Sequence, residues 1–219
     1  MERAKKNKKH IIITTVLTLL PILIGLILWN RLPEQMPTHF GVNGEPDQYS
    51  SKAFAVFFFP ILLLFIQYLM IWGTLQDPKN SRVSDKIFTM IIYVVPIVSL
   101  LVNVLIYLKA MNYEIDITRI MMCFVSLVFI IMGNYLPKTR QNYTIGIKIP
   151  WTLDDPENWD KTHRLAGYLF MVIGILIFIS TFIPGSFNLY FMVALFFASI
   201  IIPFVYSYML YRNKKTTEN

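Results

Sequence analysis

Long apolar runs without a charged side chain dominate this sequence. Five runs contain no Asp, Glu, Lys or Arg: residues 11–30, 53–76, 87–108, 120–137 and 165–211. About 20 apolar residues in a helix cross the hydrocarbon core of a bilayer, so each of the first four runs predicts one span. The fifth run has 47 residues, and its Pro-Gly-Ser turn signal at 184–186 divides it into two spans. The pattern therefore predicts six membrane-spanning segments.

These segments predict helices rather than strands. A transmembrane strand alternates polar and apolar residues over about ten positions, whereas residues 57–64 read FFFPILLL. An unpaired backbone amide in hydrocarbon costs several kcal/mol, and a helix pairs these groups internally. We expect an all-α membrane protein, a six-helix transmembrane bundle that forms one integral membrane domain over residues 1–219. The expected spans are about 11–30, 53–76, 87–108, 118–136, 165–183 and 189–211, joined by an outer loop at 31–52 and a cytoplasmic loop at 137–164.

The basic residues are distributed unevenly between the two sides of this topology. With the amino terminus in the cytoplasm, 16 of the 20 Lys and Arg residues lie inside and 4 lie outside. The positive-inside rule thus predicts a multipass protein of the bacterial cell membrane with both termini cytoplasmic. Attraction of the basic tail to anionic lipid accounts for the net charge of +7, and direct nucleic-acid binding is not expected. The first apolar run is too long for a cleaved signal peptide, so we expect a retained anchor.

The loop at 31–52 predicts a compact outer cap. Asn43-Gly44 favours the positive-φ turn of a two-residue hairpin, and three prolines stiffen the remainder. His39, Glu45 and Asp47 have the side chains of a metal or cationic-ligand site. Since a divalent metal needs three or four convergent ligands, we interpret them as solvated loop residues and expect neither metal nor cofactor.

The loop at 137–164 has a more specific pattern. Residues 144–149 alternate with period two, which predicts a short extended segment ended by Pro150 and Trp151. Asp155-Pro156 is typical of a helix cap followed by proline in the first turn. The acid-before-base pairs at 157/161 and 160/164 predict a surface helix that continues into the fifth span.

Trp159, His163 and Gly167 would share one face of that helix. Two interpretations remain open: tryptophans that anchor the chain at the membrane interface, or a dedicated binding surface. The length of the loop and its extended segment exceed what anchoring requires.

A family resemblance appears at these positions. The residues that carry it are Gly133-Asn134-Tyr135-Leu136-Pro137-Lys138, Asn142, Gly146-Ile147-Lys148-Ile149-Pro150-Trp151-Thr152-Leu153, Trp159, Thr162-His163-Arg164 and Gly167. Together they closely resemble the signature of the bacterial SdpI immunity-protein family. Pro37-Thr38-His39-Phe40 with Gly44 and Asp47 is similar to the extracytoplasmic segment near the amino terminus of many relatives. This chain has Lys148 and Ile149 where the signature has arginine and threonine, and lysine lacks the planar bidentate fork of arginine.

The resemblance implies a non-enzymatic polytopic protein that protects a bacterial cell from a secreted, membrane-active peptide toxin on its outer side. It also implies a sensing role, because one member of the family holds a transcriptional repressor at the membrane. The candidate cytoplasmic docking surface or inner gate consists of Asn134, Pro137, Lys138, Arg140, Asn142, Gly146, Lys148, Pro150, Trp151, Thr152, Trp159, Thr162, His163, Arg164 and Gly167. The candidate outer sensor consists of Pro37, Thr38, His39, Phe40, Gly44 and Asp47.

Two alternatives remain. The first is a transporter of small molecules or peptides: Leu32-Pro33 and Leu136-Pro137 each end a span, and the three spans between them allow a weak inverted 3+3 repeat. Ion-coupled carriers keep ionisable groups within their spans, whereas these spans contain only neutral polar groups such as Gln67 and Asn103. The second is a membrane-embedded hydrolase that uses His163 and Asp160, for which no catalytic motif is present.

Overall fold

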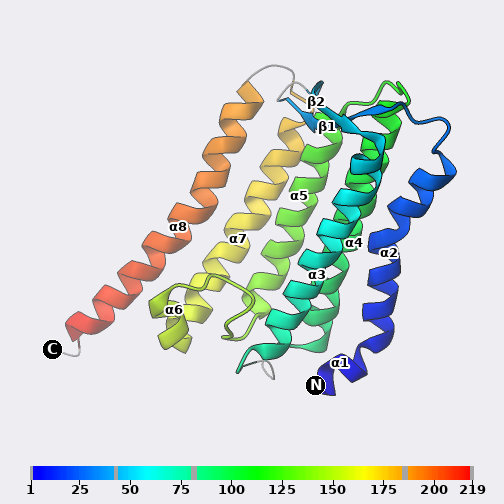
Figure 1. Cartoon of the computed structure of the whole chain (residues 1–219). Helices are drawn as coiled ribbons and strands as arrows, with labels where there is room; N and C mark the ends of the chain where they lie inside the picture. The colour runs from blue at the N-terminus through cyan, green and yellow to red at the C-terminus, as the bar shows by residue number, and fades with distance from the viewer. Residues whose placement is uncertain (1, 42–43, 80–82, 184–186, 218–219) are drawn as a thin grey trace. The chain divides into compact units, whose positions relative to one another are not determined.

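The computed structural model describes residues 2–41, 44–79, 83–183 and 187–217 (Figure 1). Within these residues, six helices are long and apolar enough to cross a membrane, as predicted: Lys8–Ile27, Phe54–Gln76, Asp85–Ala110, Ile117–Lys138, Pro156–Ser180 and Tyr190–Thr216. The predicted turn at 184–186 lies outside the described residues. The elements are α1 (Glu2–Lys6), α2 (Lys8–Ile27), β1 (Gln35–Phe40), β2 (Pro46–Ser51), the π-helix η1 (Phe54–Phe58), α3 (Phe59–Gln76), α4 (Asp85–Ala110), α5 (Ile117–Tyr135), the 3₁₀-helix η3 (Leu136–Lys138), α6 (Pro150–Asp154), α7 (Pro156–Ser180) and α8 (Phe187–Thr217).

The chain divides into two compact units. The amino-terminal unit comprises Met1–Gln76 and Ser84–Thr118, and the carboxyl-terminal unit comprises Asp77–Val83 and Arg119–Asn219. The first contains α2, α3, α4 and the two strands, and the second contains most of α5 together with α7 and α8. Three long helices in each unit is the grouping that a 3+3 repeat requires, and an inverted relation between them stays a prediction.

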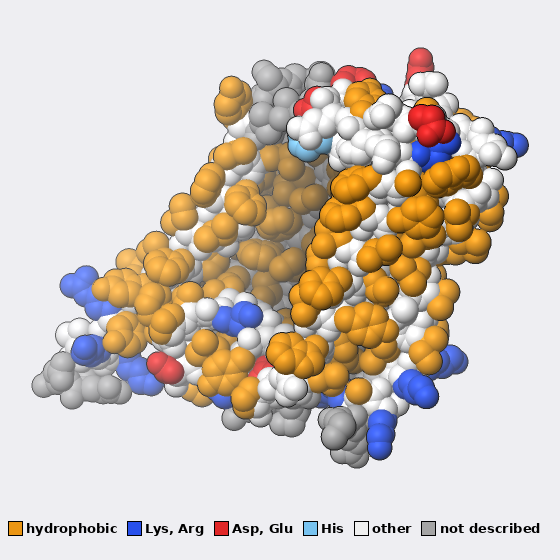
Figure 2. Space-filling view, in the orientation of Figure 1, with side chains coloured by type: hydrophobic (Ala, Val, Ile, Leu, Met, Phe, Trp, Pro, Cys, Tyr) orange, Lys and Arg blue, Asp and Glu red, His pale blue; other side chains and the backbone are white. Residues whose placement is uncertain are grey.

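The long helices of both units expose apolar side chains along their length. In Figure 2 orange side chains cover the outward faces of these helices, and charged side chains lie near the helix ends. Ile27 and Tyr190 are each 74% exposed, and Trp72 is 62% exposed. A surface of this kind is stable in contact with lipid, which agrees with a membrane-spanning protein.

The amino-terminal unit has its apolar core beside the strands. Met36 of β1 and Val56 of η1 are fully buried there, together with Tyr107 of α4. Gly25 of α2 permits this packing, because a Cβ at that position would lie 2.7 Å from Val56 Cγ1 and 2.9 Å from the Tyr107 hydroxyl. The hairpin is therefore anchored in the core by its own side chain.

Farther along the same helices, neutral polar side chains form a buried network. Gln67 of α3 accepts a hydrogen bond of 2.5 Å from the Thr18 hydroxyl and donates one of 2.9 Å to the Thr14 hydroxyl. Ser99 of α4 donates to the Thr18 carbonyl at 2.8 Å. Asn103, one turn after Ser99, has a buried Oδ1 without a hydrogen-bond partner among the described residues. The network connects α2, α3 and α4 through groups that a bilayer cannot solvate.

In the carboxyl-terminal unit, glycines bring α5 and α7 into close contact. A Cβ on Gly133 would lie 2.7 Å from the Gly167 carbonyl oxygen, and a Cβ on Gly174 would lie 2.7 Å from the Ser126 carbonyl oxygen. Gly167 and Gly174 are seven residues apart, so they lie on the same face of α7. Small residues at such a contact let two helix backbones pack directly against each other within a bilayer.

Candidate functional site: a buried polar cluster around Trp159 and His163

The helix α7 begins where the sequence predicts it. The Asp155 carboxylate accepts a 2.9 Å hydrogen bond from the Glu157 backbone N–H, and Pro156 occupies the first turn. The predicted pair of Glu157 and Lys161 is present, with 2.7 Å between Oε1 and Nζ. The helix then continues without interruption into the fifth span, as expected. Its first turns therefore hold their side chains in a fixed relation to the membrane helix.

Trp159 and His163 lie on the inner face of α7 and are buried. The Trp159 indole N–H donates to the Thr139 carbonyl at 2.6 Å. The imidazole of His163 stacks on the indole, with ring centroids 3.9 Å apart and an interplanar angle of 20°. With exposures of 0% and 1%, these side chains are part of the interior, which argues against an interfacial anchor.

Both nitrogens of His163 are engaged. Nδ1–H donates to the Trp159 carbonyl at 2.8 Å, and Nε2 accepts the Ile147 backbone N–H at 3.0 Å. One donor and one acceptor describe a neutral imidazole with its proton on Nδ1. Because both nitrogens hold backbone groups in place, His163 has no free nitrogen that could act as a general base in this geometry.

The predicted extended segment at 144–149 is wrong in its first half. Residues 144–146 form bends and Gly146 has a φ of +119°, whereas Ile149, with φ −117° and ψ 155°, is extended. Asn142 Oδ1 accepts the backbone N–H groups of Thr144 and Ile145 at 2.8 and 2.7 Å. A side-chain-capped turn competes successfully with an extended strand here, because it satisfies the backbone groups locally.

Gly146 is the point at which this loop crosses the two stacked rings. A Cβ at Gly146 would overlap His163 Nε2 and would lie 2.9 Å from Trp159 Cη2. Its positive φ is also a conformation that residues with a side chain rarely adopt. The loop can therefore close over His163 only with glycine at this position.

Pro150 begins a short helix, at the position where the sequence analysis expected the extended segment to end. The short helix α6 starts at Pro150, and the Thr152 hydroxyl donates to the Ile147 and Ile149 carbonyls at 2.8 and 2.9 Å. Trp151, partly exposed, packs against three aromatic side chains of α8: Phe204, Tyr208 and Tyr211, with ring centroids 5.5, 5.6 and 5.9 Å away.

Two residues that the sequence analysis missed support the same loop: Asp77, in the segment between α3 and α4, and Gln141, in the loop itself. The buried Asp77 carboxylate accepts hydrogen bonds from the Tyr143 N–H at 2.9 Å and the Thr144 hydroxyl at 2.6 Å. Gln141 Nε2 donates to the Thr152 and Leu153 carbonyls at 2.9 and 2.7 Å. A carboxylate directly after a span is the only signal that the sequence gives for Asp77.

The candidate residues of the loop at 137–164 thus fall into two groups. The structure brings one group together in the interior of the carboxyl-terminal unit: Asn142, Thr152, Trp159, Thr162, His163 and Gly167, with Gly146 beside them. It leaves the other group exposed: Asn134, Pro137, Lys138, Arg140, Lys148, Pro150 and Arg164, with Trp151 partly exposed. The first group builds the loop, and the second group presents charge and apolar surface on it.

The same unit connects α7 to α8 through polar side chains. Asn158 Nδ2 donates to the Ser207 carbonyl at 2.9 Å, and the Ser207 hydroxyl donates back to Asn158 Oδ1 at 2.6 Å. Thr162 donates to the same amide oxygen at 2.9 Å. This buried set fixes the first turns of α7 against α8.

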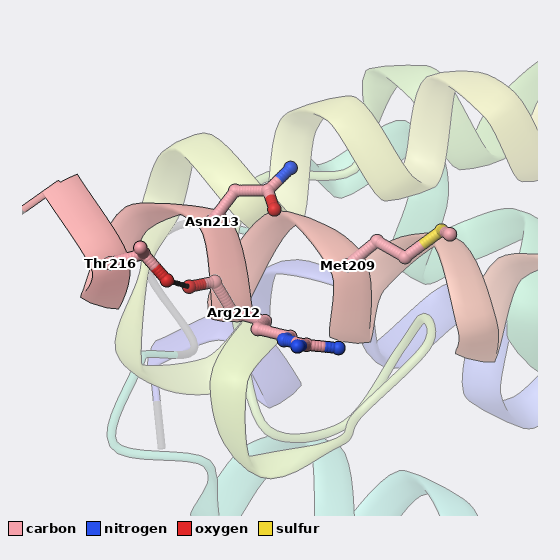
Figure 3. A pocket seen from close by; sticks show the side chains of 4 residues that line it. All are labelled: Met209, Arg212, Asn213 and Thr216. Atoms are coloured by element: carbon pink, nitrogen blue, oxygen red, sulfur yellow. Dashed lines mark hydrogen bonds between the residues drawn. The ribbon is translucent and has the colours of Figure 1, made fainter.

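A shallow hollow of about 560 Å³ lies near the end of α8 (Figure 3). Its lining residues are Met209, Arg212, Asn213 and Thr216, and the Thr216 hydroxyl donates to the Arg212 carbonyl at 3.0 Å. All four residues belong to one helix, so the hollow is an open helix surface, and we assign no site to it.

The outer loop forms the predicted cap, with one difference. β1 and β2 pair as an antiparallel hairpin, but residues 41–45 connect them rather than two residues. Gly44 has the expected positive φ of 78°, and Asn43 lies outside the described residues. Two register irregularities around His39 separate this hairpin from the regular ladder that a two-residue turn would give.

The candidate sensor residues occupy both sides of this hairpin. Pro37 and Gly44 are buried, Thr38 and Phe40 are half-buried, and His39 and Asp47 are exposed. His39 Nδ1 lies 2.5 Å from the Asp47 carboxylate, and Thr38 is hydrogen-bonded to Ser50 at 3.0 Å. These pairs cross from one strand to the other and stabilise the hairpin itself.

A buried lysine holds the base of the hairpin. Lys52 Nζ donates to the Trp29 carbonyl at 3.1 Å and to Glu34 at 2.9 Å, and it lies 5.1 Å from the centre of the Trp29 indole. The ends of α2 and β2 are therefore joined by a charged side chain that is only 6% exposed.

Comparison with known proteins places two family segments on this structure. Residues 16–64 match a domain of unknown function, DUF1648, and residues 138–207 match the SdpI/YfhL protein family. The chain resembles the SdpI family, as its sequence predicted. The immunity protein SdpI of Bacillus subtilis (strain 168) is 26% identical over 212 residues, which cover 95% of this chain and 97% of the relative. No solved structure matches the chain.

The SdpI segment coincides with the buried cluster. It begins at Lys138 and ends at Ser207, the residue whose hydroxyl bonds Asn158. The DUF1648 segment contains the complete hairpin. The relative is named as an immunity protein.

Proposed function

We propose that this protein gives a bacterial cell immunity to a secreted, membrane-active peptide toxin. The observation that carries the proposal is the similarity to an immunity protein over nearly the whole chain. The family segment contains a cluster whose histidine and tryptophan are fully engaged in holding a loop. Such a cluster suits a structural and signalling role better than a catalytic one.

The topology assigns different tasks to the two loops. The positive-inside rule predicts that the hairpin faces the exterior, where it would meet the toxin, and that the loop at 137–164 faces the cytoplasm. On that loop, exposed Lys138, Arg140, Lys148 and Arg164 surround a rigid interior. They would give a basic docking surface for a transcriptional repressor held at the membrane.

Co-culture tests the immunity function. A Bacillus subtilis strain that lacks its own SdpI is made to express this protein and is mixed with the parent strain. Expression should raise the survival of the deficient strain, and replacement of residues 37–47 by a Gly/Ser linker should remove the protection while membrane insertion is retained. Survival equal to that of the empty-vector strain would refute immunity. Full protection by the linker variant would show that the hairpin is not the sensor.

A test of the docking surface requires substitutions of exposed residues rather than of buried ones. Alanine at Trp159 or His163 would unfold the loop, so those variants report on stability. Glutamine at Arg140, Lys148 and Arg164 together removes charge without removing buried contacts. We expect this triple variant to keep protection and to lose retention of the repressor at the membrane, measured by fractionation. Unchanged retention would refute the assignment of this surface.

A transporter that removes the toxin is the second candidate. The division into two units of three long helices and the polar network around Gln67 favour it. A transporter lowers the amount of toxin associated with protected cells, whereas an immunity protein that shields its target leaves this amount unchanged. Quantification of cell-associated toxin by mass spectrometry distinguishes the two.

A further inference from the structure

We propose that the hollow between the hairpin and the connection from α4 to α5 binds a positively charged, aromatic- or apolar-containing segment of a secreted peptide. This inference rests on the proposed immunity function and names the surface that would recognise the toxin. All residues concerned belong to the amino-terminal unit. We define them together as the outer cleft: Pro33, Gln35, Pro37, Gly44, Glu45, Pro46, Tyr49, Lys109, Ala110, Asn112, Tyr113, Glu114, Ile115, Asp116 and Ile117.

The outer cleft is formed by two adjoining hollows. Their volumes are about 470 and 600 Å³, and both are lined by Glu45, Lys109 and Glu114. The hairpin supplies one wall, and the end of α4 with the following connection supplies the other. An ion pair crosses between the walls, with 3.3 Å between Lys109 Nζ and Glu45 Oε1. Two walls from distant parts of the chain give a concave surface of the size that holds a few side chains of a ligand.

The charge of the outer cleft is opposite to that of the chain. Its lining contains the carboxylates of Glu45, Glu114 and Asp116, and within the described lining Lys109 is the only cation. The net charge is thus −2 on a protein whose formal charge is +7. A neighbouring hollow that carries Arg31 marks the side at which this acidic surface ends. A cationic ligand complements the cleft, and an anionic one is repelled by it.

Exposed aromatic rings and prolines line the same cleft. Tyr49 on the hairpin and Tyr113 on the connection are each 57% exposed. Pro33, Pro37 and Pro46 supply rigid apolar surface beside them. Tyrosine faces attract ammonium and guanidinium groups as well as apolar side chains. Since prolines keep the wall in its bound shape, little conformational entropy is lost on binding.

The arrangement favours an extended peptide over a metal ion. Within the described residues, no three His, Cys, Asp or Glu side chains lie close enough together to hold a metal. The carboxylates of Glu45, Glu114 and Asp116 line two adjoining hollows, which matches a segment with more than one positive charge. The cleft lies on the side predicted to face the exterior, where a secreted peptide arrives.

Peptide binding to the full-length protein in nanodiscs of zwitterionic phosphatidylcholine tests this inference. The probes are a fluorescent 12-residue peptide that alternates lysine and phenylalanine and its counterpart with glutamate in place of lysine. Empty nanodiscs provide the background. We expect the lysine peptide to bind more tightly than the glutamate peptide and to be released by high salt. Equal affinity for the two peptides would overturn the proposal.

Removal of a negative charge and removal of a positive charge from the cleft should change peptide binding in opposite directions, whereas a loss of folding would weaken binding in both cases. Glu114→Gln and Glu45→Gln should each lower the affinity for the lysine peptide about two- to fivefold. Lys109→Gln removes the opposing cation and should raise this affinity by a similar factor. As a control, Asp85→Asn removes a carboxylate at the opposite end of α4, outside the cleft, and should leave the affinity unchanged. If Lys109→Gln weakened binding as Glu114→Gln does, the cleft residues would be structural and the proposal would be wrong.

The failure of this inference can be distinguished from the failure of the proposed function. Protection in co-culture with no preference for the lysine peptide would refute the cleft and leave immunity intact. Binding of the lysine peptide without protection would refute immunity and leave the cleft as a cationic-peptide site.

Discussion

Asp77 and Thr144 are 67 residues apart in the chain, and a hydrogen bond of 2.6 Å joins the carboxylate of the first to the hydroxyl of the second. Asp77 also accepts the backbone N–H of Tyr143. One carboxylate thus ties the short connection after α3 to the loop that closes over His163. The match to the SdpI/YfhL family begins only at residue 138. The loop at 137–164 is therefore supported by a residue, Asp77, that lies outside the matched segment.

Removal of the Asp77 carboxylate should destabilise the carboxyl-terminal unit. Asp77→Ala leaves the Tyr143 N–H and the Thr144 hydroxyl without their acceptor, which costs about 1–3 kcal/mol for each buried group that stays unpaired. We expect a lower melting temperature in detergent, measured by differential scanning fluorimetry. Asp154→Ala, at an exposed carboxylate of the same loop, is the control. Equal melting temperatures for the two variants would contradict the assignment.

Gly146→Ala should be among the most damaging single changes in the chain. The added methyl would overlap His163 and press on Trp159, and the residue would have to keep a φ of +119°. Strain at such a backbone conformation alone costs about 1–3 kcal/mol. We expect loss of the folded loop, detected as faster tryptic cleavage after Lys148.

Gly73→Ala provides the matched control for that change. Among the described residues, no atom beyond the chain neighbours and the local helix backbone lies within 4 Å of a Cβ at Gly73, and alanine is about 1 kcal/mol better than glycine inside a helix. Cleavage after Lys148 should be unchanged in this variant. Similar cleavage rates for Gly146→Ala and Gly73→Ala would show that Gly146 does not have the role described.

Asp155 should give α7 a pH-dependent stability. Burial raises the pKa of its carboxyl, but hydrogen bonds from Lys214 and from the Glu157 N–H lower it more, so the pKa lies below its usual 3.8. A carboxyl whose pKa is lower in the folded than in the unfolded protein stabilises the fold at a pH above the unfolded-state pKa. This stabilisation is lost as the pH falls through the folded-state pKa.

The corresponding variants separate the cap from the ion pair. At pH 7, Asp155→Ala should cost about 0.5–2 kcal/mol through loss of the helix cap. Asp155→Asn keeps an acceptor oxygen and loses only the pair with Lys214, for which we expect about 0–1 kcal/mol. Urea denaturation followed by circular dichroism measures the free energy of unfolding. The difference in this free energy between Asp155→Ala and the unchanged protein should become smaller below pH 3. A gap that widened there would contradict the direction of the pKa shift.

The polar network among α2, α3 and α4 predicts opposite outcomes for two similar substitutions. Gln67→Leu removes the partner of Thr14 and Thr18 and should lower thermal stability, by about 0.6 kcal/mol for each lost hydrogen bond. Asn103→Leu removes a buried oxygen that has no partner in the described residues and should leave stability unchanged or raise it. Thermal unfolding in detergent measures both. A larger loss for Asn103→Leu would assign Asn103 a role that its contacts in the structure do not show.

The predicted membrane sidedness can be tested with single cysteines. Cys123 is the only cysteine of the chain, so Cys123→Ser gives a background without reactive thiols. In that background, Tyr113→Cys and Tyr143→Cys place a thiol at sites that are 57% and 48% exposed. A membrane-impermeant maleimide should label the first in intact cells and the second only after permeabilisation. The reverse pattern would invert the topology.

The sequence was sufficient for the parts of the fold that depend on local composition. Charge-free runs predicted the six long helices, and Asp155-Pro156 predicted the start of α7, because a cap is a contact between near neighbours. The period-two pattern at 144–149 was wrong for residues 144–146, since it describes only which side chains alternate. Whether such a segment becomes a strand depends on a partner strand, and here Asn142 and His163 satisfy its backbone groups instead.

The candidate site was predictable in its residues but not in their roles. Trp159 and His163 were selected as a possible surface, and their burial shows that they form the interior of the loop. Asp77 and Gln141 were missed, because their contacts join segments that no local pattern relates. The outer cleft likewise depends on how the hairpin lies against residues 109–117, which spacing along the chain does not encode.

The contact of Lys52 with Trp29 and Glu34 determines where the hairpin can be exchanged. The buried ammonium group of Lys52, which directly follows β2, joins the hairpin to the end of α2 through the Trp29 carbonyl. Chimeras that exchange this hairpin between relatives should therefore be joined before Trp29 and after Lys52. A junction between these two residues would pair each of them with a foreign partner.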